Sequence, residues 1–148
     1  MKRLIVRSAL LLGLCALICH GAAFAASIIR VKPTGSDSNS GASWPLAKQT
    51  IQAALAAAVS GDDIWVAAGT YTGSVALKTG VGLYGGFAGS EESASERDWR
   101  ANVTTLDGQQ ATNVVVIPAM AEFCSLDGFA VANRATDYYG GGIHCANG

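Results

Sequence analysis

The sequence predicts an all-β solenoid, a fold in which short strands coil and stack, with one α-helix closing its first coil. Three observations predict it. Short runs of apolar and β-branched residues, separated by glycine turns, fill the chain after residue 61. Four of these runs share a register near 20 residues. One alanine-rich segment with helical spacing of its apolar residues comes before them. A β-sandwich also has short, regularly spaced strands and stays open as an alternative.

The composition points to one compact folded unit. The chain has 148 residues, of which 50% are hydrophobic and 14% are charged. That length is typical of a single domain. A chain with this many apolar residues can offset the entropy that it loses on folding by burying them, which argues against intrinsic disorder. Eighteen glycines against three prolines indicate many tight turns between short elements.

Residues 1–25 have the pattern of a secretory signal peptide. Three basic residues lie among the first seven, residues 9–18 form a continuous apolar run, and Ala23 and Ala25 supply the small residues before a cleavage site. We expect cleavage between Ala25 and Ala26, and therefore a secreted, extracellular or cell-surface protein. The apolar run is short of the roughly 20 residues that span a bilayer, and an uncleaved anchor is the alternative.

Cleavage changes the charge of the protein. The mature chain loses three basic residues and keeps seven against eleven acidic ones, a net charge of −4. An acidic domain lacks the basic surface that binds nucleic acid or anionic lipid. We therefore expect no nucleic-acid partner and no membrane span in the mature chain.

The first part of the mature chain, residues 26–43, is predicted to be a strand and a loop. Residues 28–31 are β-branched and apolar, and residues 33–43 are rich in glycine, serine, aspartate and asparagine. Residues 44–148 then hold the helix and the first coils. We predict a helix over residues 46–59, with Ser43 as its N-cap and Gly61 ending it.

Short strands are predicted through the rest of the chain, interrupted by a polar excursion at residues 90–100. They share β-branched or aromatic residues and boundaries of glycine or polar turns. The expected strands are residues 64–67, 69–71, 74–77, 81–87, 103–106, 114–117, 123–131 and 143–145.

Four of these runs set the repeat. Ile64, Leu83, Leu106 and Leu126 follow one another at 19, 23 and 20 positions. A single coil cannot bury its inward residues alone, but coils stacked at the strand spacing of about 4.8 Å bury a continuous apolar column. The first coil would expose the end of that column, and we expect the helix to cover it. The alternative is a helix packed on the face of a sheet.

Three segments resemble one family. They read IQAALAAAVSGDDIWVAAGTY (residues 51–71), VGLYGGFAGSEESASERDWRANVTTLDG (81–108) and GFAVANRATDYYGGGIHC (128–145). The first resembles the N-terminal cap and first coil of right-handed parallel β-helix proteins of the pectin-lyase-like superfamily. The second, the most specific, resembles a subgroup of secreted bacterial β-helix proteins. The resemblance implies a right-handed parallel β-helix with an N-terminal capping α-helix. Because family members have many more coils, the chain is interpreted as an N-terminal piece, incomplete at its C-terminus.

Two aspartates form a candidate metal site. With a repeat of 20, Asp107 and Asp127 would stack in adjacent coils about one strand spacing apart. Two carboxylates that close repel each other unless one takes up a proton or a cation binds between them, and Ca²⁺ prefers such oxygen ligands. The alternative is that each Asp-Gly pair is an ordinary turn with its side chain in water.

Two cysteines form a candidate disulfide. Cys124 and Cys145 lie 21 positions apart, again near one repeat. Stacked positions would place their Cα atoms about 5 Å apart, within the range of a disulfide. The alternative is a pair of unbridged thiols.

The sequence carries no complete catalytic pattern. The pair Asp62-Asp63 is not accompanied by the histidine and arginine motifs that the superfamily's hydrolases use in catalysis. We therefore name no catalytic residue, and no cofactor beyond the candidate Ca²⁺. Tyr84, Trp65, Trp99 and the pair at 138–139 could form an aromatic sugar-binding strip, although Trp65 is expected to pack against the excursion. We therefore expect a secreted structural or adhesive protein, with extracellular glycans or a cell-surface component as partner. The alternative is the N-terminal part of a polysaccharide lyase or glycoside hydrolase whose catalytic residues lie beyond Gly148.

Overall fold

The computed structural model describes residues 26–110, 113–133 and 142–146. The predicted signal peptide and its cleavage site therefore lie outside the described residues, apart from Ala26. The elements are β1 (Ile28–Val31), α1 (Ile51–Ala57), β2 (Asp63–Ala67), β3 (Gly69–Thr72), β4 (Val75–Ala76), β5 (Gly82–Phe87), the 3₁₀ turn η1 (Ala94–Glu96), β6 (Thr104–Asp107), β7 (Val115–Ile117), β8 (Ser125–Asp127), β9 (Phe129–Ala132) and β10 (Ile143–Cys145).

The strands form three parallel sheets. The first sheet has the order β1-β2-β5-β8, the second β3-β6-β9 and the third β4-β7-β10. Every strand pair within them is parallel. The prediction of a mostly β protein built from short stacked strands is confirmed, and the antiparallel pairing of a β-sandwich is not found in the described sheets.

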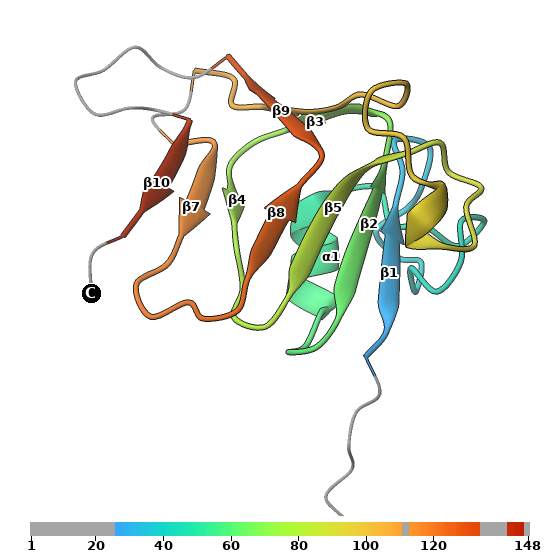
Figure 1. Ribbon diagram of the computed structural model, residues 1–148, viewed down its shortest axis with the longest axis horizontal. Coiled ribbons are helices and arrows are strands. Elements are labelled where there is room, and N and C mark those ends of the chain that lie inside the picture. The colour runs from blue at the N-terminus through green and yellow to red at the C-terminus, as the bar shows by residue number, and fades with distance from the viewer. Residues whose placement is uncertain (1–25, 111–112, 134–141, 147–148) are drawn as a thin grey trace, which may run out of the picture.

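The chain visits the three sheets in a fixed order. β2, β3 and β4 enter the first, second and third sheets in turn, and β5, β6 and β7 repeat the sequence, as do β8, β9 and β10. We call these three successive groups the first, second and third runs. Each run therefore adds one strand to each sheet (Figure 1).

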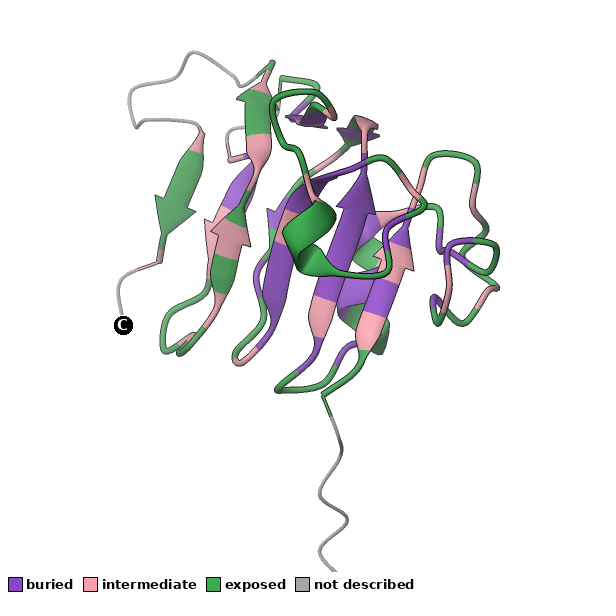
Figure 2. Ribbon diagram, turned by 45° about the vertical axis from the view of Figure 1, so that its right-hand side comes forward, coloured by how far each residue is buried: buried purple, intermediate pink, exposed green. Residues whose placement is uncertain are grey.

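The inward residues of the first sheet build the main core. Parallel register aligns Ile29 with Ile64, Ile64 with Leu83, and Leu83 with Leu126. Ile64 and Leu83 are fully buried, whereas Leu126 in the third run is only partly buried. Burial is thus densest in β2 and β5 and falls toward β10, as Figure 2 shows.

The expected repeat of 20 residues is wrong for one of its four members. Leu106 does not join the column of Leu83 but lies in β6 of the second sheet, in register with Tyr71 and Val131. The second run is long because residues 88–103 separate β5 from β6. A leucine at the right spacing therefore belongs to a different sheet.

The helix is shorter than predicted and begins later. It spans Ile51–Ala57, and its N-cap is Thr50, whose hydroxyl accepts a hydrogen bond from the backbone N–H of Ala53. Ser43 is therefore not the cap. Residues 41–48 instead use their backbone groups along the outer edge of β1, where Lys48 donates to the Arg30 carbonyl and forms a parallel bridge with Val31.

The helix packs into the core beside β1, β2 and β4, and its role as a cap stays a prediction. Ile51, Ala54 and Leu55 are buried in the same cluster as the inward residues of the sheets. No helix in the described part of the chain is both long and apolar enough to cross a membrane.

A second apolar cluster lies on the outer face of the first sheet. The Trp65 ring stacks on Phe87 with ring centres 4.6 Å apart and an angle of 12° between the planes. Trp44, from the loop beyond β1, packs against the same Phe87 at 5.8 Å. The Arg30 guanidinium lies 5.3 Å from the Trp65 ring centre, a favourable cation–π distance. Both faces of this sheet are therefore covered by packed side chains.

Candidate functional site

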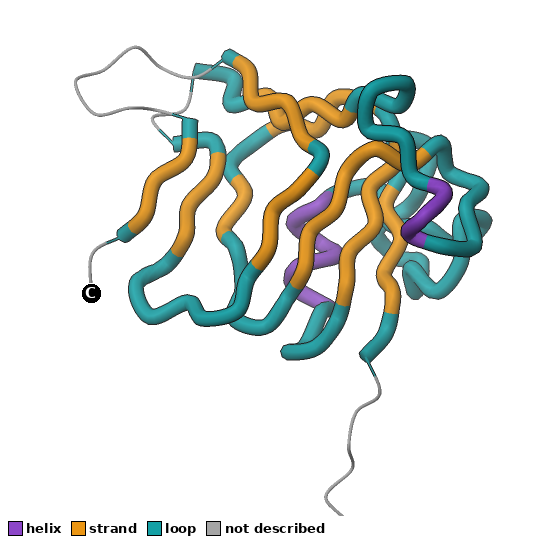
Figure 3. Tube along the Cα trace, in the orientation of Figure 1, coloured by secondary structure: helices purple, strands orange, loops and turns teal. Residues whose placement is uncertain are grey.

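The polar excursion predicted from the sequence lies across the first sheet as an ordered strap, which we define as residues 88–103. It leaves β5 and returns at β6, and Figure 3 shows its 3₁₀ turn η1 in purple in front of the strands. A capping box closes η1, because the Ser93 side chain and the Glu96 side chain bond each other's backbone N–H groups.

Glu91 anchors the start of the strap. Its buried carboxylate accepts hydrogen bonds from the backbone N–H groups of Ala88, Gly89 and Ser90, the latter two at 2.9 Å. Burial acts to raise the pKa of Glu91, but these backbone donors outweigh it and hold the pKa below its usual value. Glu91 therefore stays ionised and keeps the turn closed.

The end of the strap rests directly on β5. The Asp98 N–H donates to the Gly86 carbonyl at 3.1 Å. Gly86 has φ +92°, and a Cβ added there would lie 2.6 Å from the Cα of Trp99. Only glycine permits this approach, so Gly86 determines where Trp99 stands.

The facing wall is the corner between β8 and β9. Gly128 makes this corner with φ +80°, and a Cβ added there would lie 2.6 Å from the Gly85 carbonyl oxygen. The corner splits the single strand predicted over residues 123–131 into β8 and β9. It directs Asp127 and Phe129 to the two sides of the turn.

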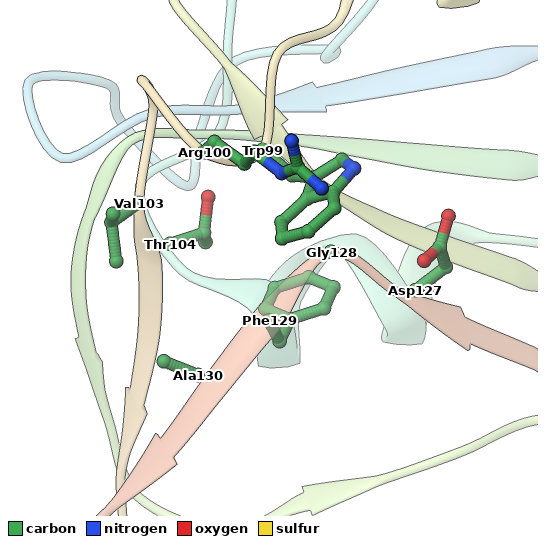
Figure 4. Close-up of a pocket in the computed structure, with 8 residues that line it drawn as sticks. All are labelled: Trp99, Arg100, Val103, Thr104, Asp127, Gly128, Phe129 and Ala130. Carbon is green, nitrogen blue, oxygen red and sulfur yellow. The ribbon is translucent and has the colours of Figure 1, made fainter.

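Between the strap and this corner lies an open groove of about 550 Å³. Trp99 is 51% exposed and Phe129 is partly buried, so two aromatic rings face the groove beside Val103. In the view of Figure 4 both rings lie between Val103 and Asp127. The groove is lined by Trp99, Arg100, Val103, Thr104, Asp127, Gly128, Phe129 and Ala130.

Charged groups border the aromatic part of the groove. Arg97 forms an ion pair with Asp127, donates to the Gly85 carbonyl at 3.3 Å, and stands 5.7 Å from the Tyr84 ring centre. The Arg100 guanidinium lies 4.8 Å from the ring centre of Trp99. The groove thus combines flat apolar faces with donors and acceptors of both charges.

No protein-family model, curated protein or solved structure matches this chain. The groove's own side chains therefore supply the chemistry on which a function can be based.

The two aspartates of the candidate Ca²⁺ site are not brought together. Asp107 lies in β6 of the second sheet, where it accepts hydrogen bonds from Asn133 Nδ2 and the Gln109 N–H, both at 2.9 Å. Asp127 lies in β8 of the first sheet and pairs with Arg97. The expected stacking is wrong because Asp107 and Asp127, although 20 residues apart, lie in different sheets. Within the described ranges, no three His, Cys, Asp or Glu side chains are grouped as a metal site.

The two cysteines do not occupy stacked positions in one sheet. Cys124 immediately precedes β8 and is partly buried against the main core, whereas Cys145 ends β10, is exposed and is in register with Ile117. Both are free thiols. The stacking that would have allowed a disulfide is absent for the same reason as for the aspartates.

Asp62 immediately precedes β2, and Asp63 is the first residue of that strand. The buried Asp62 carboxylate accepts hydrogen bonds from the N–H and hydroxyl of Ser27, each at 2.9 Å, and from the Val59 N–H at 2.8 Å. Burial acts to raise the pKa of Asp62, but these donors and the nearby Lys78 hold it below its usual value. The hydrogen bonds of Asp62 thus hold the segment just before β1 against the start of β2. Asp63 has a raised pKa, because of its burial and the neighbouring Asp62 charge.

The predicted aromatic strip survives only in part. Trp65 is 4% exposed and packs mainly on Phe87, rather than on the excursion as expected. Tyr84 is partly buried beneath Arg97. The tyrosines at 138–139 lie outside the described residues. Among the members of the set that the structure describes, Trp99 alone lines the groove.

The sequence interpretation missed two residues that line the groove, Phe129 and Arg100, and one that borders it, Arg97. Phe129 falls within the strand predicted over residues 123–131, and Arg97 and Arg100 fall within the predicted polar excursion. The signal available was the run Arg97-Asp98-Trp99-Arg100, which alternates charge with an aromatic ring. The turn at Gly128 was the second signal, because a glycine inside a strand pattern marks a bend.

Proposed function

We propose that this chain is a secreted or cell-surface right-handed parallel β-helix protein with a structural or adhesive role, and that its groove binds an extracellular glycan. The β-helix is supported by the way each run adds one parallel strand to each of three sheets. The helix α1, which is buried in the same cluster as the inward strand residues, would be the cap of such a fold.

One observation carries the glycan assignment: the exposed ring of Trp99 faces the same groove as Phe129, next to a carboxylate and two guanidinium groups. A sugar ring has apolar faces of C–H groups and an edge of hydroxyls. Aromatic rings pack against such faces, and carboxylate and guanidinium groups bond to hydroxyls. The groove offers both in one place.

Contacts within the chain hold both walls of the groove. Its strap wall is held by the Glu91 carboxylate and by the contact of Trp99 with Gly86, and its other wall is the backbone corner at Gly128. A binding surface that is ordered beforehand loses less entropy on binding. Such rigidity favours the recognition of a repeating polymer on the outside of an elongated protein.

An extracellular site agrees with the predicted leader. Residues 1–25 read as a signal peptide, and cleavage would leave a mature chain of net charge −4. An open groove on an acidic, exported domain is accessible to polysaccharides and is poorly suited to nucleic acid.

The proposal is tested by affinity electrophoresis in native gels that contain hydroxyethylcellulose, xylan or alginate. Trp99→Ala removes the exposed ring, and Leu46→Ala is the matched control, because Leu46 is 50% exposed and lies outside the groove. We expect at least one polymer to retard the parent protein and the Leu46 variant equally. The Trp99 variant should migrate as it does in a polymer-free gel.

Two results would overturn the proposal. One is that none of the polymers retards the parent protein. The other is that Trp99→Ala is retarded as strongly as Leu46→Ala. New reducing ends or unsaturated products are measured on the same polymers, because release of either would favour a hydrolase or a lyase over a binding protein.

A further inference from the structure

The two walls of the groove come from different runs of the chain. The strap follows β5 of the second run, and the corner at Gly128 joins β8 to β9 of the third run. The width of the groove therefore depends on how the second and third runs are held together beside it.

The strap wall is attached to the second run independently of the third. Asp98 donates to the Gly86 carbonyl, and the Asp98 carboxylate accepts the N–H groups of Arg100 at 3.0 Å and Ala101 at 3.1 Å. Trp99 lies directly over Gly86. These contacts fix the strap on β5 but do not connect it to the corner.

Backbone pairing of β5 with β8 and of β6 with β9 joins the two runs, and Arg97 adds a side-chain connection between the walls of the groove. Its guanidinium is bonded to Asp127 on β8, donates to Gly85 on β5 and stands over Tyr84. A Cβ on Gly128 would also lie 3.3 Å from Arg97 Nη1, so the guanidinium reaches the corner itself. In the described part of the chain, Arg97–Asp127 is the one ion pair between side chains.

We infer that Arg97 is a positioning residue of the groove, which ties the strap to the third run and so sets the distance between Trp99 and Phe129. Arg97 itself is not among the residues that line the groove. The inference rests on the proposed glycan binding for its binding readout only, because the position of Trp99 can be measured without a ligand.

The geometry requires an arginine. One planar guanidinium can donate to a carboxylate and a carbonyl while it stacks on an aromatic ring, whereas a lysine ammonium is a point charge without that plane. Arg97→Lys therefore keeps the charge and loses the simultaneous contacts. Arg97→Met loses both.

The ligand-free test is acrylamide quenching of tryptophan fluorescence. Trp44 and Trp65 are 6% and 4% exposed, so quenching in this protein reports mainly on Trp99. We expect greater quenching in Arg97→Met and Arg97→Lys than in the parent protein. Glu92→Gln is the matched control, because Glu92 is an exposed strap residue outside the groove.

Asp127→Asn removes the ion pair with Arg97 from the other wall of the groove. It replaces the Arg97 variants in the test if far-UV circular dichroism shows that they do not fold. The inference is overturned if folded Arg97→Met and Asp127→Asn are quenched no more than Glu92→Gln. It is also overturned if Arg97→Lys is quenched as the parent protein is, because charge alone would then suffice.

The binding readout uses the same polymer gels. A single partly exposed ion pair contributes modestly, so we expect Arg97→Met to bind about three- to tenfold more weakly. If no polymer retards the parent protein while the quenching changes as expected, the glycan assignment fails and the positioning role of Arg97 stands. If binding is seen but Arg97→Met binds as tightly as Glu92→Gln, the positioning role fails and the glycan assignment stands.

Discussion

The indole N–H of Trp44 donates a hydrogen bond of 2.9 Å to the backbone carbonyl of Glu91, and so joins two segments that are 47 residues apart. Trp44 belongs to the loop that covers the edge of β1, and Glu91 begins the strap. The same Glu91 closes its turn through its carboxylate. This contact makes the outer face of the first sheet a packed layer, on which the groove wall is built.

Trp44→Phe is expected to destabilise the fold by about 1–2 kcal/mol, because it removes a buried donor and leaves the Glu91 carbonyl unpaired. The measurement is the free energy of unfolding in urea. Trp99→Phe is the control, since an exposed ring should change stability by less than about 0.5 kcal/mol. Equal effects of the two substitutions would contradict the role of this hydrogen bond.

Glu91→Gln is expected to weaken the dependence of stability on acid pH. The pKa of Glu91 is lower in the folded chain than the ordinary value of 4.5. Its contribution is therefore fully present above pH 4.5 and is lost as the pH falls through the folded pKa. We expect the variant to lose about 1–2 kcal/mol at pH 7 and less at pH 3. The check is urea unfolding at both values, and a loss that does not depend on pH would refute the ionic role.

Asp63→Asn should act in the opposite direction. Burial and the Asp62 charge raise the Asp63 pKa above 3.8, so its ionised form disfavours the folded state above the folded pKa, and the effect vanishes below 3.8. The variant should gain no more than about 1 kcal/mol at neutral pH, since Asp63 is partly exposed. The gain should shrink as the pH falls toward 3.8. Thermal melts across this range test it, and a less stable variant at pH 7 would count against it.

The corner at Gly128 is expected to tolerate no side chain. Gly128→Ala places a methyl group against the Gly85 carbonyl in addition to its positive φ, and we expect a loss of about 2 kcal/mol or more. Gly61→Ala is a matched comparison, because Gly61 has φ +99° with nothing within 4 Å of an added Cβ. That variant should lose only about 1 kcal/mol. Equal losses in denaturant unfolding would show that backbone conformation alone matters at Gly128.

Both Cys124 and Cys145 should be alkylated without prior reduction. Cys124 precedes β8 of the first sheet and Cys145 ends β10 of the third, so a bond between them would need the strands to rearrange. Peptide mass analysis after alkylation under native conditions should show exposed Cys145 modified first and the partly buried Cys124 later. Recovery of a Cys124–Cys145 linked peptide from unreduced protein would overturn this placement.

Local patterns predicted most of the strands. β1, β2, β3, β7 and β10 lie within a residue or so of the predicted ranges, because each is a short apolar or β-branched run bounded by turn residues. The helix begins at residue 51 rather than at the predicted residue 46. Ser43 has the chemistry of an N-cap, but residues 41–48 bond to the edge of β1, and a pairing with a distant strand is not visible in local sequence.

The groove was the least predictable part. Trp99 was a candidate from its residue type, but its partner Phe129 and the tie from Arg97 to Asp127 depend on segments 30 residues apart. The prediction that Asp107 and Asp127 stack was wrong for the same reason. Their spacing matches the sequence repeat, but they lie in separate sheets. A long insertion between two strands changes which residues face each other without changing the local pattern.

The amino-acid sequence determined by itself that the chain after residue 26 forms short strands with glycine turns and a helix against their core, because hydrophobic spacing and turn chemistry act between near neighbours. Tertiary structure alone decided which strands share a sheet, where the strap rests and which side chains meet in the groove. Those outcomes depend on contacts between distant residues, whose strength comes from burial and register rather than from any short segment.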